Sequence, residues 1–142
     1  MATIQQFEDL TFWIEARDLN NRIFAAIINN VKIKDQALKD QINRSAGSIM
    51  DNIAEGFERQ GNKEFRQMLT IARGSCGEVK SQLIRALDRS YISNDQFKEM
   101  NTHCVNISKM INGFVNYLNK SEFKGSKFKE PIEIYNNYEQ SY

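Results

Sequence analysis

Three basic residues recur at seven-residue intervals in the middle of the chain, namely Arg66, Arg73 and Lys80. On a helix this interval places them along one side, beside the apolar seam that packs inward. Arg59 and Lys63 continue the same side toward a turn. Arginine and lysine neutralise phosphates and supply most of the non-specific affinity for nucleic acid. The spacing therefore predicts a basic stripe that contacts phosphate, although charges beside a seam also pair with neighbouring helices.

The last part of the chain mixes lysines with aromatic residues. Four lysines lie near its start: Lys120, Lys124, Lys127 and Lys129. Three aromatic residues are interleaved with them: Tyr117, Phe123 and Phe128. This mixture suits phosphate contact combined with base stacking. We expect the tail, residues 120–142, to dock on a partner or a neighbouring subunit, and a disordered tail is the alternative.

The residue types that carry most catalytic and metal chemistry are scarce. His103 is the single histidine, and Cys76 and Cys104 are the two cysteines. A di-iron bundle needs two Glu-x-x-His pairs, and the sequence has none. Glu99 lies four residues before the histidine, which is typical of a pair on a helix surface. The cysteines fall at seam positions, where cysteine acts as a small hydrophobe. We therefore predict a protein with no catalytic, metal or cofactor site.

Length and composition set limits on the elements that position these residues. The chain has 142 residues, 41% of them hydrophobic, with one proline and a formal net charge of +1. That length fits a single domain, and the neutral total excludes a uniformly basic surface. No run approaches the ~18 apolar residues of a membrane span, and the first residues do not resemble a signal peptide. We expect a cytoplasmic protein without membrane contact.

Four helical stretches account for residues 1–119. They are expected at about 9–30, 35–59, 63–89 and 93–119. The third and fourth carry apolar residues alternately four and three apart, a spacing that buries one seam per helix. Asp35 is a candidate N-cap, Ser93 begins a capping box, and Gly61 suits a left-handed turn. Short connections favour an all-α, antiparallel, up-down-up-down four-helix bundle.

The first helical stretch has a wider apolar arc than a bundle core requires. A core-facing stripe covers roughly 100°, and the surplus here is centred on four residues: Trp13, Phe24, Ile28 and Val31. A surplus of this kind is typical of a subunit interface. The alternative is that the tail or the segment around Phe7 covers it.

Reflection across the turn at Gly61 predicts which residues of the second and third helices lie level. It sets Gly47 and Ser48 against Ser75 and Gly74, so that small residues let the two backbones approach closely. It also sets Arg44 opposite Glu78, a structural polar pair between the helices.

Two sequence strings together resemble a family signature. The first is Gln41-x-x-Arg44-Ser45-x-x-Ser48-Ile49-x-x-Asn52-Ile53-Ala54-Glu55-Gly56, and the second is Ala72-Arg73-Gly74-Ser75-x-x-Glu78. They resemble the bacterial four-helix-bundle proteins, also called 23S rRNA-intervening sequence proteins. That family is similar in turn to the accessory variability determinants of diversity-generating retroelements. Three shorter segments agree: Leu10-x-x-Trp13-x-x-Ala16-Arg17, Glu64-Phe65 and Tyr91-Ile92.

The resemblance implies a fold, an assembly and a class of function. It implies a four-helix bundle that assembles as a ring-like homo-oligomer, typically a pentamer, without enzymatic activity. It also implies association with RNA or DNA, or service as an accessory subunit of a reverse transcriptase. A ring would repeat the basic stripe and create a local positive band despite the neutral total. The alternative function is a structural scaffold for protein–protein interaction with no nucleic-acid role.

Overall fold

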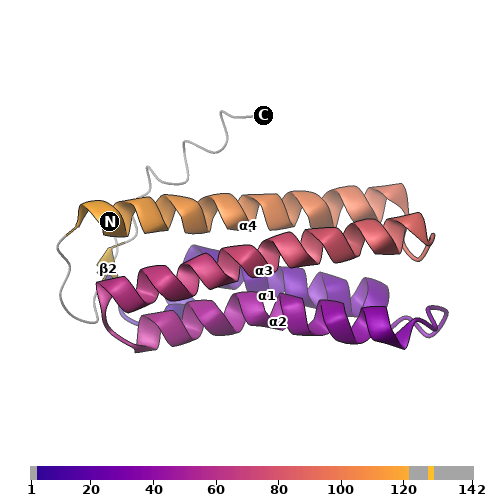
Figure 1. Cartoon of the computed structure of the whole chain (residues 1–142), viewed down its shortest axis with the longest axis horizontal. Helices are drawn as coiled ribbons and strands as arrows, with labels where there is room; N and C mark the ends of the chain where they lie inside the picture. The colour runs from indigo at the N-terminus through magenta and orange to yellow at the C-terminus, as the bar shows by residue number, and fades with distance from the viewer. Residues whose placement is uncertain (1–2, 122–127, 130–142) are drawn as a thin grey trace.

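The computed structural model describes residues 3–121 and 128–129, and within them four long α-helices lie side by side (Figure 1). The helices are α1 (Thr11–Ile23), α2 (Gln36–Glu58), α3 (Asn62–Asp88) and α4 (Asn94–Lys120). Two short strands, β1 (Thr3–Ile4) and β2 (Phe128–Lys129), pair antiparallel. The predicted all-α class with four helices is confirmed. None of the helices in the described ranges is both long and apolar enough to cross a membrane.

Two helix starts follow from local sequence signals. The Asp35 carboxylate accepts a hydrogen bond from the Leu38 backbone N–H at 3.1 Å and caps α2. Ser93 and Gln96 form a reciprocal capping box at the start of α4, with distances of 3.1 and 2.9 Å. Both arrangements satisfy backbone donors that the first turn of a helix leaves unpaired. Both starts agree with the sequence prediction.

The turn between α2 and α3 differs from the prediction by one residue. Gln60, not Gly61, adopts the left-handed conformation, with φ of 60°. Gly61 is the N-cap of α3, with an extended φ of −114°, and Asn62 is the first helical residue. The Asn62 side chain donates to the carbonyls of Leu118 and Ser121 at 3.0 and 3.3 Å. Its amide thus satisfies carbonyls at the carboxyl end of α4.

The first predicted helix is divided in the structure. After α1 the chain continues as a π-helix, Phe24–Ile28, in which the Asn29 N–H bonds the Phe24 carbonyl at 2.8 Å. A π-helical turn holds more residues than an α-helical turn and so rotates the side chains that follow. Ile27 is buried as a result, whereas Phe24 is 52% exposed.

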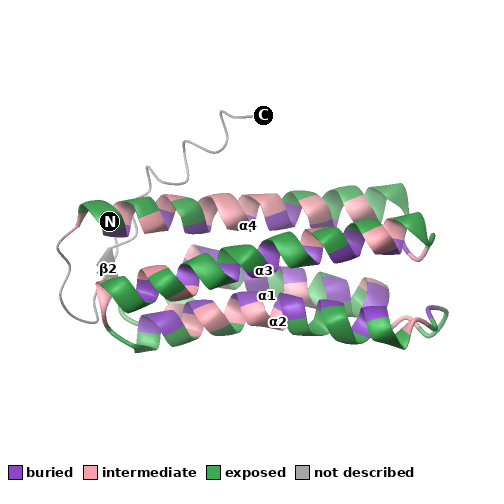
Figure 2. Cartoon of the chain, viewed as in Figure 1, coloured by how far each residue is buried: buried purple, intermediate pink, exposed green. Residues whose placement is uncertain are grey.

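The core lies between the four helices, where each turns its buried residues inward (Figure 2). Phe114 of α4 contacts Phe12 of α1 and Phe65 of α3, with ring centroids 5.3 and 5.6 Å apart. Cys76 and Cys104 lie within this core as free thiols. Burial raises the pKa of each thiol to about 12, so both are protonated at neutral pH and pack as small hydrophobes.

Candidate nucleic-acid interface

The predicted basic stripe lies on the side of α3 that meets α4, where its arginines bond to asparagines. Arg66 Nη1 donates to Asn119 Oδ1, and Arg73 Nη1 donates to Asn112 Oδ1, each at 2.6 Å. Arg66 and Arg73 are seven residues apart on α3, and Asn112 and Asn119 are seven residues apart on α4. The two hydrogen-bonded pairs therefore repeat about 10 Å apart along the helices. We call these four residues the arginine–asparagine flank.

The partners on this flank are uncharged, so hydrogen bonding does not cancel the positive charge. Among the described residues, no ion pair involves Arg66, Arg73 or Lys80. The Nε of Arg66 is buried without a hydrogen-bond partner in the same part of the chain. Lys80 comes one heptad further along α3, level in this register with the apolar Val105. The flank therefore fixes the direction of two guanidinium groups and leaves their charge available to an anion.

The other predicted basic residues are placed in several ways relative to this flank. Arg59 forms an ion pair with Glu55 on α2, with Nη2 and Oε1 2.6 Å apart. Lys63 and Lys120 are exposed at the adjoining ends of α3 and α4. In β2 the backbone of Lys129 is level with Thr3. Lys124 and Lys127 lie outside the described residues, so their predicted role stays a prediction.

A polar groove of about 430 Å³ lies on the opposite side of α3, against α2. We call it the α2–α3 groove, and it is lined by Gln41, Arg44, Ser45, Ser48, Ser75, Glu78, Gln82 and Arg85. Gln82 Nε2 donates to Ser45 Oγ at 2.9 Å, and that hydroxyl donates to the Gln41 carbonyl at 3.0 Å. This leaves Gln82 Oε1 buried without a partner among the described residues.

A second chain of hydrogen bonds runs beside the first. Asn52 Nδ2 donates to Ser48 Oγ at 2.8 Å, and the Ser48 and Ser75 hydroxyl oxygens are 2.9 Å apart. Ser75 Oγ donates to the Ile71 carbonyl at 3.2 Å, so Ser48 supplies the proton between the two serines. The serine hydroxyls that link α2 to α3 are thus satisfied within the fold, as buried polar groups require.

The predicted Arg44–Glu78 pair is not formed. Both residues line the α2–α3 groove, but none of the ion pairs in the described part of the chain joins them. The long Gln82 side chain reaches Ser45 from about five residues further along α3 than the position that simple reflection predicts. At the rim, Arg85 donates to Gln41 Oε1 at 2.6 Å. The register of the two helices nevertheless agrees with the reflection, because Ser48 bonds to Ser75 and Phe57 packs against Phe65. Arg44 and Glu78 are both exposed side chains that do not meet.

The predicted small residues do face each other, since Ser48 bonds to Ser75, but the glycines beside them are not closely packed. A Cβ added at Gly47 or Gly74 would meet nothing within 4 Å, so neither glycine lies in a tight contact. The close approach is at Gly56, where an added Cβ would lie 2.8 Å from Met68 Cβ and 3.1 Å from Phe65 Cδ1. The two helices therefore need glycine near the turn and not at mid-length.

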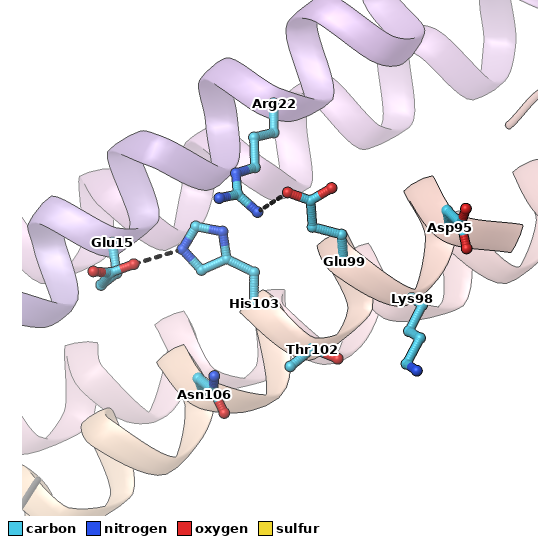
Figure 3. Close-up of a pocket in the computed structure, with 8 residues that line it drawn as sticks. All are labelled: Glu15, Arg22, Asp95, Lys98, Glu99, Thr102, His103 and Asn106. Atoms are coloured by element: carbon cyan, nitrogen blue, oxygen red, sulfur yellow. Dashed lines mark hydrogen bonds and ion pairs between the residues drawn. The ribbon is translucent and has the colours of Figure 1, made fainter. Parts of the chain in front are cut away.

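A charged cluster joins α1 to α4 around an open pocket (Figure 3). His103 Nε2 lies 2.7 Å from Glu15 Oε2, and Arg22 Nη1 lies 3.0 Å from Glu99 Oε1. The structure thus differs from the predicted Glu99–His103 surface pair, because each residue bonds across to α1. His103 is 9% exposed, and its Nδ1 is buried without a partner in the described ranges.

The four residues predicted to form a subunit interface divide into two pairs. Trp13 and Ile28 are half-buried and pack against the core. Trp13 also meets Phe7 edge-on, with ring centroids 5.1 Å apart, as the alternative of a covering N-terminal segment expects. Phe24 and Val31 are 52% and 77% exposed. Only the second pair offers free apolar surface in the single chain.

Sequence reasoning missed the acceptors of the arginine–asparagine flank and part of the groove. Asn112 and Asn119 share the seven-residue interval of the two arginines, and this matching interval was the available signal. The helical pattern alone does not identify Gln82 and Arg85 as groove residues. A glutamine directly beside the seam residue Leu83 was the signal there, since a polar side chain next to a seam must find a partner when it is buried.

Comparison with known proteins gives one family and one fold. A family model described as 23S rRNA-intervening sequence protein matches residues 8–113. A crystal structure from Bacteroides thetaiotaomicron VPI-5482, of a protein with unknown function from the S23 ribosomal protein family, is similar with a TM-score of 0.66. The two sequences are 24% identical, and the match covers 74% of this chain and 98% of that chain. That likeness shows the fold alone. No curated protein matches the chain.

Proposed function

The chain belongs to the 23S rRNA-intervening sequence protein family, and from this premise we propose that it is a non-catalytic protein that binds RNA. The observation that carries the proposal is the arginine–asparagine flank. Two arginines are held in direction by neutral partners, so each guanidinium keeps its full charge and some of its donors. Contacts from such groups to phosphates bind nucleic acid without regard to sequence.

The local arrangement accounts for RNA binding by a nearly neutral chain. Phosphate contact depends on the charges within about a Debye length, roughly 8–10 Å at physiological salt. Arg66, Arg73 and Lys80 form a line along α3, and a single RNA strand laid along it meets cations at regular intervals.

Two charge-matched variants test the proposal. One replaces Arg66, Arg73 and Lys80 with alanine, and the other replaces Arg17, Lys32 and Lys34, three exposed basic residues away from the flank. Fluorescence anisotropy with labelled single-stranded RNA at low salt measures affinity. We expect the RNA affinity of the first variant to fall roughly tenfold or more and that of the second to stay within about twofold of wild type. Equal losses would contradict the proposal, because only net charge would then matter.

We also propose an up-down-up-down bundle that assembles as a ring-like homo-oligomer, with five subunits as the resemblance implies. Gln41 bonds late in α3, at Arg85, whereas Ser48 bonds earlier, at Ser75, and this order supports opposite helix directions. Exposed Phe24 and Val31 support the assembly, since apolar surface of this kind is typical of interfaces.

Analytical ultracentrifugation tests the assembly. A Phe24→Glu, Val31→Glu variant is expected to sediment as a smaller species than the wild-type protein. The control, Ile71→Glu with Ile84→Glu, adds the same charge at other exposed apolar positions and should keep the wild-type size. A wild-type protein that sediments as a monomer would overturn the proposal.

Three further points stay predictions: service to a reverse transcriptase, the alternative of a structural scaffold for protein–protein interaction, and cytoplasmic location.

A further inference from the structure

The α2–α3 groove contains a polar atom that the fold leaves unused. Gln82 is 7% exposed and its Oε1 is buried without a partner among the described residues. The neighbouring hydroxyls do not fill this need, because Ser45 and Ser75 direct their protons to backbone carbonyls. A buried acceptor without a donor is costly. The groove therefore offers an acceptor that a ligand N–H satisfies.

The rim of the groove supplies further groups of both kinds. Glu78 provides an exposed carboxylate and Arg44 an exposed guanidinium, and both line the groove with Gln82. The groove thus contains two acceptors, the Gln82 amide oxygen and the Glu78 carboxylate, and one group with several donors, the Arg44 guanidinium. A ligand that matches it presents two N–H donors beside an acceptor.

Among the RNA bases, guanine alone presents that pattern on one edge. Its N1–H and N2–H groups are adjacent donors, and its O6 is an acceptor beside them. Uracil has a single N–H between two carbonyls, and adenine and cytosine each place one amino group beside ring or carbonyl acceptors. Unstacked bases of single-stranded RNA are commonly bound through this Watson–Crick edge.

We propose that the α2–α3 groove holds a guanine base of single-stranded RNA, with Gln82 and Glu78 accepting its N–H groups and Arg44 donating to O6. This inference rests on the proposed RNA binding and assigns it a base preference. The outer face of α3 connects the two sites, because Gly74 and Gly77 have nothing within 4 Å of an added Cβ. An RNA strand is able to cross the helix closely there. Phosphates on the arginine–asparagine flank position the strand, and the groove reads one base.

The test compares two labelled RNAs, an oligouridine and the same strand with one central guanosine. We expect wild-type protein to bind the guanosine strand about tenfold more tightly, within the range for a good polar base contact. Inosine in place of guanosine removes the N2 amino group and should remove part of the preference. Anisotropy titrations at one fixed salt concentration measure both affinities.

Variants locate the preference in the groove. Glu78→Gln keeps an exposed side chain of the same shape and should bring the ratio of affinities close to one, as should Gln82→Met. Asp88→Asn, another exposed acid of α3, is the matched control and should keep the tenfold ratio. Circular dichroism melts verify that each variant is folded, and Glu78→Gln remains decisive if the buried substitution unfolds.

The outcomes separate this inference from the proposed function. Equal wild-type affinity for both strands, or a preference that survives Glu78→Gln, overturns the guanine site. Salt-dependent binding of the oligouridine would still support the proposed function. If neither RNA binds at low salt, the proposed function and this inference both fail.

Discussion

The polar residues on the two sides of α3 differ in their hydrogen-bond partners. Toward α4, Arg66 and Arg73 bond to neutral amides, so the geometry is fixed and the charge is kept. Toward α2, serine hydroxyls form short chains of hydrogen bonds whose last acceptors are backbone carbonyls. The first arrangement contributes little to folding, because exposed polar contacts stabilise weakly. The second links two helices in a fixed register. One helix thus presents charge on one side and a buried polar layer on the other.

Breaking the polar layer should have the largest effect on stability. Ser45→Ala removes the acceptor of Gln82 Nε2 and leaves a second group of this buried amide unpaired. We expect the free energy of unfolding to fall by about 1–3 kcal/mol, measured by urea denaturation.

The matched control for that change is Ser81→Ala, an exposed serine of α3. It should alter the free energy of unfolding by no more than about 0.5 kcal/mol. Oligouridine affinity should stay the same in both variants, since the arginine–asparagine flank lies on the other side of the helix. A loss of that affinity in Ser45→Ala would show that the two sides are not independent.

Two glycine substitutions in α2 should change the stability of the protein by smaller amounts and in opposite directions. Gly47→Ala adds a methyl group to open space and should stabilise the protein by roughly 0.5–1 kcal/mol through helix propensity. Gly56→Ala forces Met68 to move and should destabilise it by about 1 kcal/mol or more. Thermal melts of both variants measure the difference. Stabilisation by both would contradict the close approach near the turn.

Acid pH should have the smallest effect, through the N-cap of α2. The Leu38 N–H, followed by Tyr91 and Arg89, lowers the pKa of Asp35 below its usual 3.8. A lowered carboxyl pKa stabilises the folded state above the unfolded pKa, and this contribution is lost as pH falls below about 3.8.

Urea denaturation at several pH values between neutral and acidic conditions checks this expectation. Asp35→Asn should show a weaker dependence on pH below about 4 than wild-type protein. Asp51→Asn, an exposed aspartate of the same helix, should follow the wild-type curve more closely. A wild-type curve parallel to that of Asp35→Asn would assign the acid sensitivity to other groups.

Local and periodic features could be predicted from the sequence. The caps at Asp35 and Ser93 depend on residues only three apart, and the seams of α3 and α4 depend on regular spacing. Both kinds of signal act within one helix. The four-helix class follows from them directly.

Relations between helices could not be predicted in the same way. The left-handed residue is Gln60 and not Gly61, and next to this turn the Asn62 side chain bonds to α4, a contact distant in sequence. The Arg44–Glu78 pair is not formed although Ser48 and Ser75 bond close to the predicted level, because helix register does not fix where two exposed side chains point. The asparagine partners of Arg66 and Arg73 depend on the register between α3 and α4. Each of these needs the packed arrangement and not the pattern of one segment.

The salt dependence of RNA affinity tests the central claim most directly. Each phosphate contact to single-stranded nucleic acid contributes about 0.7 to the slope of log affinity against log salt. Replacing Arg66, Arg73 and Lys80 with alanine should therefore make the slope shallower by about 2. The variant lacking Arg17, Lys32 and Lys34 should run parallel to wild type. Parallel lines for all three proteins, or a wild-type affinity independent of salt, would contradict the account.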